Sequence, residues 1–400
     1  MLRDKPARRI EWRRHTQFDD GLDGGCEMLE MRWVKVVIIV VCGGILIGLS
    51  GCGSSSPATT MPPPPTLQLA YVANNLDNTV SGYVINSSTG ALAPTSAGPF
   101  PAGTGPFSIA VEPSGKFAYV ANATSNDVSG FSIDLTTGTL SPLAGSPFPA
   151  GANPAAVSVD PSGKFVYVAD YGSGEITGFT INATSGALAA MAGSPFPSAT
   201  EVIEVAVNPA GSFAYAAGQG GTLSAYQLDS QTGALAEISG SPYLAGPEPS
   251  SVQTAPSGNF LYVTNETTDT TYEFSLDSST GAASLIGNTT PIGGAARGAA
   301  IDPSGQYLYV ADAFGNNIIA YQIDSSTGIL TPLATGPFAT GQIPISMTFD
   351  PSKKYVYVAC QGGVYGYAFD ASNGTLTPLA GSPFPAGNAP IWIAVTGTAQ

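Results

Sequence analysis

The chain has 400 residues, of which 43% are hydrophobic and only 10% are charged, and its formal net charge is −15. Eight of the 13 basic residues lie before residue 36, so the chain after residue 51 carries 21 acidic residues against five basic ones. This composition excludes a nucleic-acid-binding protein, which needs a dense basic surface. The single histidine is His15, which excludes any mechanism that needs an imidazole further along the chain.

The N-terminal part of the chain predicts an export signal. Residues 1–30 are polar and carry both charge signs, and we interpret them as an extension upstream of a start at Met28 or Met31. Residues 31–51 then read as a signal peptide, because two basic residues precede the uncharged apolar run 36–49. That run is shorter than the roughly 20 residues that a membrane-spanning helix needs.

The apolar run ends in Leu-Ser-Gly-Cys, which resembles the bacterial lipobox and makes Cys52 the expected lipidation site. The alternative is a plain signal peptide with an incidental cysteine. Residues 52–66 continue as a Ser/Pro-rich tether. We therefore expect a protein held on a membrane by its lipid, outside the cytoplasm in the cell envelope, at the outer membrane or in the periplasm.

Residues 67–400 consist of one repeated unit. An aromatic segment recurs as LAYVANN, FAYVANA, FVYVADY, FAYAAGQ, FLYVTNE, YLYVADA and YVYVACQ. Its central tyrosines follow one another at intervals of 47 or 48 residues: Tyr71, Tyr119, Tyr167, Tyr215, Tyr262, Tyr309 and Tyr357. A fixed period of this length is typical of solenoids and propellers.

Each unit predicts four short strands separated by turns. In the second unit these are 108–113, 116–122, 127–134 and 140–143, with a Pro-Ser-Gly-Lys turn after the first strand. Proline and glycine there suit the φ angles of a tight turn. The strands are rich in Val, Tyr, Phe and Ile, and no stretch has helical periodicity.

Seven four-stranded units predict an all-β fold, a seven-bladed β-propeller over residues 67–400. The repeats begin at a second strand, LQLAYVAN, and end at a first strand, IWIAVTG (391–397). We therefore expect the C-terminal strand to complete the N-terminal blade and close the ring. An open solenoid is the alternative, and it would leave both half-units unfinished.

The YVAN/YVTN segments, the D-P-S-G-K/Q turns and the T-G-x-L steps resemble the seven-bladed lactonase-like propellers. That family includes 6-phosphogluconolactonase-type enzymes and secreted YVTN-repeat proteins. The resemblance implies a lactonase activity with an Arg-His pair before the first strand of a blade. Of the seven matching triplets, only Ala296-Arg297-Gly298 keeps the arginine, and none keeps the histidine.

Two first-strand residues stand out as candidates for the site. Glu204 occupies a position held by small residues in most other units and faces the centre, where a buried carboxylate would be a base of raised pKa or a cation ligand. The alternative is a glutamate hydrogen-bonded to water or backbone. Trp392 takes the same position in the closing strand, as a stacking platform or as a plug of the channel.

The loops between the second and third strands predict an acidic, amide-rich rim. It includes the candidate ligand-binding residues Asp170, Glu266 and Asp312, beside Arg297. Such oxygen ligands suit Ca²⁺ or a glycan, although no contiguous calcium loop occurs, and a solubilising surface is the alternative. The lysines lie in the turns at the other end, where we interpret them as solvated.

We thus expect a ligand-binding or scaffolding propeller whose ligand is a glycan, a peptide or a protein, bound at the end formed by the rim. The alternative is a lactonase-type hydrolase, with metal assistance through Glu204 and the rim carboxylates. The absent Arg-His pair favours binding over catalysis, and the sequence predicts no confident catalytic or metal-ligating residue.

Overall fold

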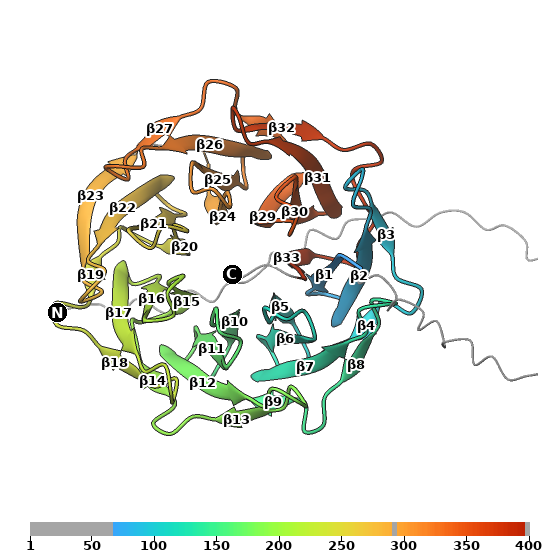
Figure 1. Ribbon diagram of the computed structural model, residues 1–400, viewed down its shortest axis with the longest axis horizontal. Helices are drawn as coiled ribbons and strands as arrows, with labels where there is room; N and C mark the ends of the chain where they lie inside the picture. The colour runs from blue at the N-terminus through green and yellow to red at the C-terminus, as the bar shows by residue number, and fades with distance from the viewer. Residues whose placement is uncertain (1–66, 290–293, 397–400) are drawn as a thin grey trace, which may run out of the picture. The chain divides into compact units, whose positions relative to one another are not determined.

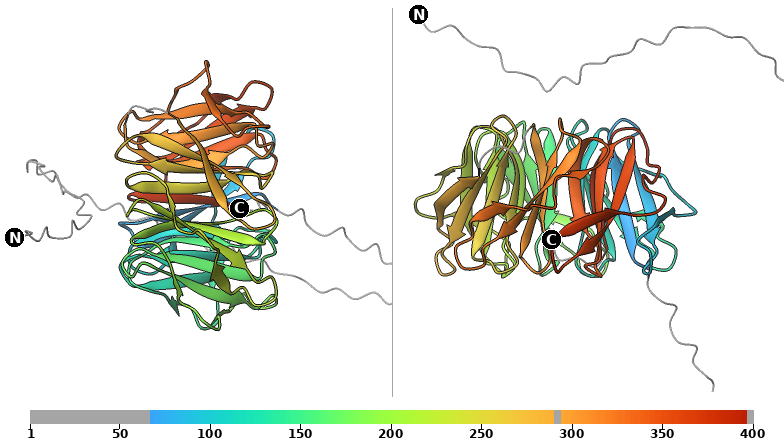
Figure 2. Two further views of the ribbon diagram at one scale, coloured as in Figure 1. Left: turned by 90° about the vertical axis from the view of Figure 1, so that its left-hand side faces the viewer. Right: turned by 90° about the horizontal axis from the view of Figure 1, so that it is seen from above.

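In the computed structural model, residues 67–289 and 294–396 are described. They form seven β-sheets arranged radially around a central channel (Figure 1), and the side views show a flat disc (Figure 2). The predicted seven-bladed propeller is confirmed. No helix in these two ranges is long and apolar enough to cross a membrane. The predicted signal segment and Cys52 lie outside the described residues.

The two inner strands of each blade carry the repeated sequence. The innermost strands are β5 (Pro106–Val111), β10 (Pro154–Val159), β15 (Val202–Val207), β20 (Pro249–Thr254), β24 (Ala296–Ile301), β29 (Gln342–Phe349) and β33 (Pro390–Val395). The second strands, which hold the YVAN segments, are β1 (Leu69–Asn74), β6 (Phe117–Asn122), β11 (Phe165–Asp170), β16 (Phe213–Gly218), β21 (Phe260–Asn265), β25 (Tyr307–Asp312) and β30 (Tyr355–Gln361). Nearly every residue of these second strands is buried, as expected for a sheet packed on both faces.

The outer half of each blade is less regular. The third strands are β2 (Thr79–Ile85), β7 (Asp127–Ile133), β12 (Glu175–Ile181), β17 (Thr222–Leu228), β22 (Thr270–Leu276), β26 (Asn317–Ile323) and β31 (Gly363–Asp370). The outermost strands are β3 (Leu92–Pro94), β8 (Leu140–Pro142), β13 (Leu188–Ala190), β18 (Leu235–Glu237), β23 (Ala283–Thr289), β27 (Leu330–Pro332) and β32 (Thr375–Pro378). Five blades add a two-residue strand on the third strand: β4 (Phe100–Pro101), β9 (Phe148–Pro149), β14 (Phe196–Pro197), β19 (Tyr243–Leu244) and β28 (Phe338–Ala339).

The ring closes within one blade, which we call blade 1, built from β33 and β1 to β4. The strand order is β3-β2-β1-β33, and β33 pairs antiparallel with β1. Leu69 and Thr396 add two further hydrogen bonds, from the Leu69 N–H to the Thr396 hydroxyl (3.0 Å) and from the Thr396 N–H to the Leu69 carbonyl (2.9 Å). The predicted closure by the C-terminal strand is confirmed, and the remaining blades are numbered 2 to 7 along the chain.

A hydrogen bond from a tyrosine joins each blade to the next. The hydroxyl of Tyr119 in blade 2 donates to the carbonyl of Gly186 in blade 3 (2.8 Å), and Tyr357 in blade 7 donates to Gly90 in blade 1 (2.7 Å). The same bond recurs at all seven tyrosines of the repeat. The glycine that accepts this bond has positive φ in every blade, and in six of the seven it lies close to an aromatic ring, so a side chain there would be both strained and crowded.

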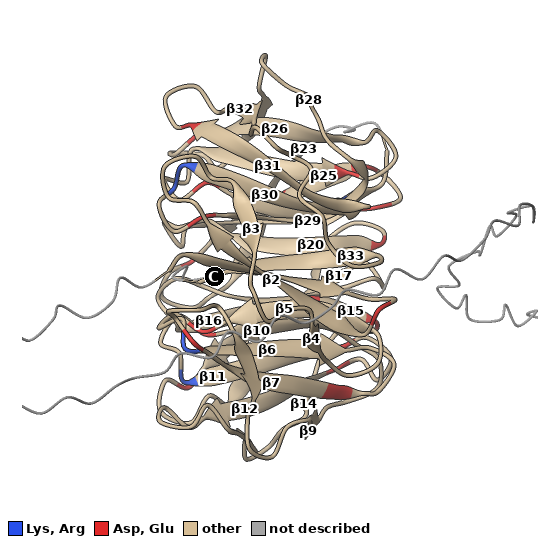
Figure 3. Cartoon of the chain, turned by 90° about the vertical axis from the view of Figure 1, so that its right-hand side faces the viewer, with Lys and Arg blue, Asp and Glu red and all other residues tan. Residues whose placement is uncertain are grey.

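In blades 2, 3, 6 and 7 a carboxylate holds the turn between the first and second strands. Asp160 accepts hydrogen bonds from the N–H groups of Ser162, Lys164 and Phe165 and from the Ser162 hydroxyl. This places its charge under the turn and leaves the following lysine exposed. The D-P-S-G-K motif therefore serves the fold, and its lysines extend from one end of the disc (Figure 3).

Aromatic residues of the segments that connect one blade to the next lie between blades. Phe148, which follows blade 2, packs in one cluster with Val157, Val166 and Phe179 of blade 3. Blade 5 differs from the others. Its outer strand β23 runs for seven residues, and, as in blade 7, no two-residue strand is added to its sheet within the described residues.

Candidate functional site

One residue of each innermost strand, the fifth in β29 and the third in the other six, forms one layer of the channel wall. Six of these residues pair with, or stand level with, the last but one residue of the second strand, and Ser346 pairs with Ala359, the third residue from the end of β30. The layer consists of Ser108, Ala156, Glu204, Ser251, Gly298, Ser346 and Trp392. Five of its seven members are small, so Glu204 and Trp392 supply most of its side-chain volume, and Glu204 supplies its only charge.

Side chains of this layer connect neighbouring blades. The Ser108 hydroxyl accepts a hydrogen bond from the N–H of Val157 (3.2 Å), and the Ser346 hydroxyl accepts one from Ile393 (3.1 Å). Glu204 makes the equivalent bond in blade 4, because its Oε2 accepts from the N–H of Val252 in blade 5 (2.8 Å). The glutamate is thus anchored as the serines are.

The side chain of Glu204 is longer than that of serine and accepts hydrogen bonds from more donors. Its Oε1 accepts a hydrogen bond from Gln253 Nε2 (3.2 Å), and the Ser251 hydroxyl also donates to the carboxylate. Only 7% of the residue is exposed. Burial raises the pKa of Glu204 to about 7, although its hydrogen bonds to Val252, Ser251 and Gln253 oppose that rise. The carboxyl group therefore exists in both protonation states near neutral pH.

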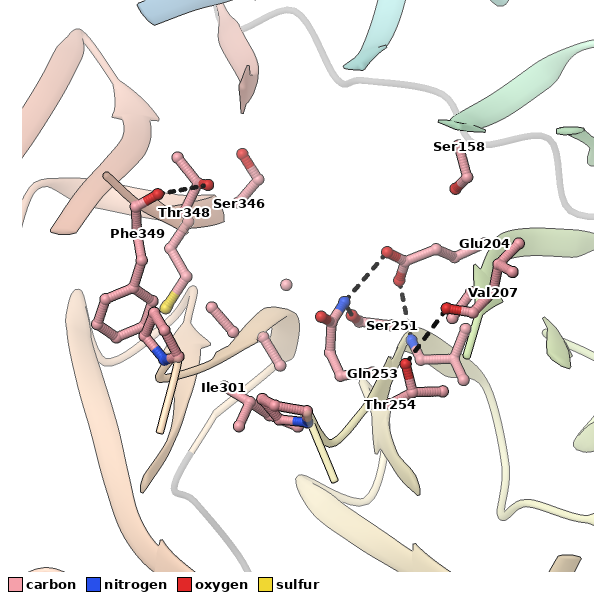
Figure 4. A pocket seen from close by; sticks show the side chains of 18 of the residues that line it. Ser158, Glu204, Val207, Ser251, Gln253, Thr254, Ile301, Ser346, Thr348 and Phe349 are labelled. Atoms are coloured by element: carbon pink, nitrogen blue, oxygen red, sulfur yellow. Dashed lines mark hydrogen bonds between the residues drawn. The ribbon is translucent and has the colours of Figure 1, made fainter. Parts of the chain in front are cut away.

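The channel contains a cavity of about 460 Å³ beside Glu204. Figure 4 shows Glu204, Gln253 and Thr254 on one side and Thr348 and Phe349 on the other. The wall formed by β15 and β20 carries the charged group and the amide of Gln253. The wall formed by β24 and β29 carries mainly apolar side chains together with two hydroxyl groups: Ala300, Ile301, Met347 and Phe349 beside Ser346 and Thr348. Trp392 of β33 also lines the cavity and is partly exposed. This volume and this mixture of apolar walls with few polar groups are typical of small-molecule sites.

The cavity extends toward the turns between first and second strands. Its wall at that end includes Pro209, Pro256, Pro303 and Lys353. The ligand was instead expected at the opposite end, among the loops between second and third strands. The layer next to Glu204 toward that end consists of Ala, Ser and Thr side chains except for Gln253, and these small side chains leave space inside the channel.

Arg297 does not reach the cavity. It lies on β24 near the other end of the disc from the lysines, as predicted, and its Nη2 pairs with Glu266 Oε1 at 2.7 Å. Burial raises the pKa of Glu266, and the charge of Arg297 opposes that rise. The guanidinium group of Arg297 is therefore already paired with a carboxylate at the rim.

Asp170 and Asp312 end second strands, and neither lines the cavity. Asp170 is fully buried and accepts hydrogen bonds from the Thr177 hydroxyl (2.5 Å) and N–H (3.1 Å). Asp312 accepts one from the N–H of Gly315 (2.7 Å). Asparagine takes the same place in three other blades, as Asn74, Asn122 and Asn265. The position braces the loop that follows the strand.

The rim carboxylates do not assemble a metal site. Within residues 67–289 and 294–396, no three His, Cys, Asp or Glu side chains are placed so that they could hold an ion. The expected calcium-binding rim therefore has no cluster of metal ligands in this part of the chain.

Gln253, Thr254, Met347 and Phe349 line the cavity and were not among the predicted site residues. A signal for Gln253 existed in the repeats. It is the fifth residue of its innermost strand, where the aligned residues of the other blades are only Ala, Ser or Thr. A long polar side chain at that position, next to the exceptional Glu204, marks the same part of the channel.

A seven-bladed propeller with a ligand-sized cavity on its axis is the class of protein that the fold and the site define. The family model for the seven-bladed β-propeller lactonases matches residues 63–204, 205–340 and 295–395, and the chain belongs to that family. No curated protein matches the sequence.

Several solved structures share the fold. A putative 6-phosphogluconolactonase from Bacteroides fragilis is 22% identical, with a TM-score of 0.71 over 85% of this chain and 100% of that one. A second, from Bacteroides uniformis, is 21% identical, with a TM-score of 0.73 over 83% and 100%. The periplasmic gluconolactonase of Pseudomonas aeruginosa is 17% identical, with a TM-score of 0.69 over 83% and 99%.

Proposed function

We propose that this chain is a lipid-anchored, extracytoplasmic protein that binds a small molecule in the channel beside Glu204. The observation that carries the proposal is the cavity of about 460 Å³ with one ionisable side chain in its central layer. Cavities of this size hold a metabolite or a short oligosaccharide unit, whereas a folded protein partner would contact the disc from outside. The anchoring rests on the sequence around Cys52 alone.

The charges around the cavity argue against a phosphorylated ligand. Phosphate groups are bound by clustered cations, usually with paired hydrogen bonds from arginine. The only basic residue on the wall of this cavity is the exposed Lys353 at its mouth, and Arg297 already pairs with Glu266. A phosphosugar would also meet the Glu204 carboxylate at close range.

Hydrolysis of an uncharged lactone is the second candidate. It is supported by the family and by the pKa of Glu204, which burial raises to about 7 and so places near the working pH of a general base. Glu204 would take a proton from water, the water oxygen would attack the lactone carbonyl carbon, and the ring C–O bond would break. The proton would then return to the leaving alkoxide.

Binding is tested by filling the cavity. Ala206 lies on its wall, so Ala206→Trp occupies the space, and Ala93→Trp on the exposed outer strand β3 is the matched control. Thermal midpoints are measured with a panel of uncharged sugars, lactones and small amines. We expect at least one compound to stabilise the native protein and the control but not Ala206→Trp. Equal stabilisation of all three, or of none, refutes the proposal.

Hydrolysis is tested with one further variant. Release of acid from glucono-δ-lactone and from 6-phosphogluconolactone is followed at constant pH with the native protein and with Glu204→Gln. Turnover of the uncharged lactone that is lost in Glu204→Gln would establish the second candidate. Rates equal to the buffer rate would dismiss it and leave the binding proposal intact.

A further inference from the structure

The negative charge of Glu204 has no structural purpose in the channel. The bond that it accepts from Val252 is made in two other blades by the neutral serines Ser108 and Ser346. Its other donors, Gln253 and Ser251, are also neutral. Glu204 makes no ion pair with any residue in the described ranges. A serine would complete the blade contact without burying an ionisable group, which is costly when it is unpaired.

The wall that faces Glu204 combines apolar side chains with the hydroxyl groups of Ser346 and Thr348. In Figure 4 the carboxylate and Phe349 lie on opposite sides of the open space, and Met347 and Ile301 belong to the same side as Phe349. Trp392 stands in the same layer as Glu204, three blades away around the ring. Apolar and aromatic side chains around a carboxylate complement a molecule with a positive group and an apolar part.

The charge of the whole propeller has the same sign as Glu204. After residue 51 the chain has 21 acidic and five basic residues. A strongly negative protein raises the local concentration of cations and repels anions, and a channel with low-dielectric walls focuses this field. Both the near and the distant charges therefore favour a cation in the cavity.

We propose that the cavity binds a small organic cation, with its ammonium group on the Glu204 carboxylate and its apolar part against β24, β29 and Trp392. This inference rests on the proposed function and names the class of its ligand. An ammonium group can donate hydrogen bonds to the carboxylate oxygens while Val252 and Gln253 keep theirs. The cavity volume of about 460 Å³ limits the ligand to a compact molecule.

Protonation of Glu204 competes with such a ligand. The neighbours of Glu204 on β10, β15 and β20 carry no titratable side chain. The other ionisable residues on the cavity wall are Asp350, which is buried under its turn, and the exposed Lys353 at the mouth. With the pKa of Glu204 at about 7, the ionised fraction falls about 50-fold between pH 7 and pH 5. The affinity for a cation falls by the same factor.

The test compares two probes of the same shape. Isothermal titration calorimetry is performed on the full chain in detergent with 2-phenylethylammonium and with the neutral 2-phenylethanol. The proteins are the native chain, Glu204→Gln, and the control Glu237→Gln. The Glu204→Gln side chain keeps an acceptor oxygen for the N–H of Val252, and Glu237 is an exposed glutamate on β18 whose loss removes the same charge at a distance.

We expect the native protein and Glu237→Gln to bind the ammonium probe about tenfold or more tightly than the alcohol at pH 8. Glu204→Gln should lose that preference, and the native affinity for the ammonium probe should fall about 50-fold from pH 7 to pH 5. Equal binding of the two probes, an unchanged preference in Glu204→Gln, or no saturable binding of the ammonium probe overturns the inference. If the alcohol binds and Ala206→Trp blocks it, the small-molecule site stands without the cation.

Discussion

Replacing Asp170 by asparagine should stabilise the protein at pH 8 and leave it unchanged at pH 4. Asp170 is fully buried on β11, and burial raises its pKa from 3.8 to about 6 despite hydrogen bonds from Thr177 and Gly151. A carboxyl with a raised folded-state pKa favours folding below its unfolded-state pKa, and this contribution is lost as the pH rises through the folded-state value. Asparagine occupies the same position in blades 1, 2 and 5, so the substitution fits the site.

The size of this effect follows from the two pKa values. A separation from 3.8 to about 6 corresponds to about 3 kcal/mol, which is the largest gain that Asp170→Asn can show at pH 8. Guanidinium unfolding of both proteins at pH 4 and pH 8 measures the difference. Asp229→Asn is the control, because hydrogen bonds from Gln231 and Thr232 lower the pKa of Asp229, and its loss should destabilise at pH 8. Equal stability of Asp170→Asn and the native protein at pH 8 would refute the reasoning.

One further substitution and one truncation test the ring. Tyr119→Phe leaves the buried carbonyl of Gly186 without its donor and should lower the free energy of unfolding by about 1–3 kcal/mol, measured by guanidinium unfolding; an unchanged midpoint would contradict the role given to this bond. Deleting residues 390–400 removes β33 and exposes the edge of β1, so we expect a lower thermal midpoint and a larger hydrodynamic radius by light scattering. If neither quantity changes, the closure is not needed for the fold.

The architecture could be predicted because the sequence pattern of one blade recurs seven times. The spacing of the YVAN tyrosines fixes the number of blades, and the unfinished units at the two ends predict that β33 pairs with β1. The first strand of blade 2 was expected over 108–113 and is found at Pro106–Val111, because proline is tolerated at a strand start. The two-residue strands such as β9 are not among the four strands that each unit predicts. Two residues carry no alternation from which a strand could be recognised.

The site was only partly predictable. Glu204 and Trp392 stood out because they interrupt a pattern of small residues, and both line the cavity. The other candidates were chosen for their chemistry, but other interactions hold them away from the cavity. Arg297 forms an ion pair with Glu266, and Asp170 and Asp312 accept hydrogen bonds from the strand or loop that follows. The depth of the cavity depends on how the side chains of seven strands fill the axis together, and no single repeat contains that information.

A crystal structure of the protein grown with 2-phenylethylammonium tests the central claim most directly. We predict electron density for the probe in the channel, with its nitrogen within hydrogen-bonding distance of the Glu204 carboxylate and its ring beside Met347 and Phe349. An empty channel at saturating probe, or density found only on the outer surface, would contradict the account.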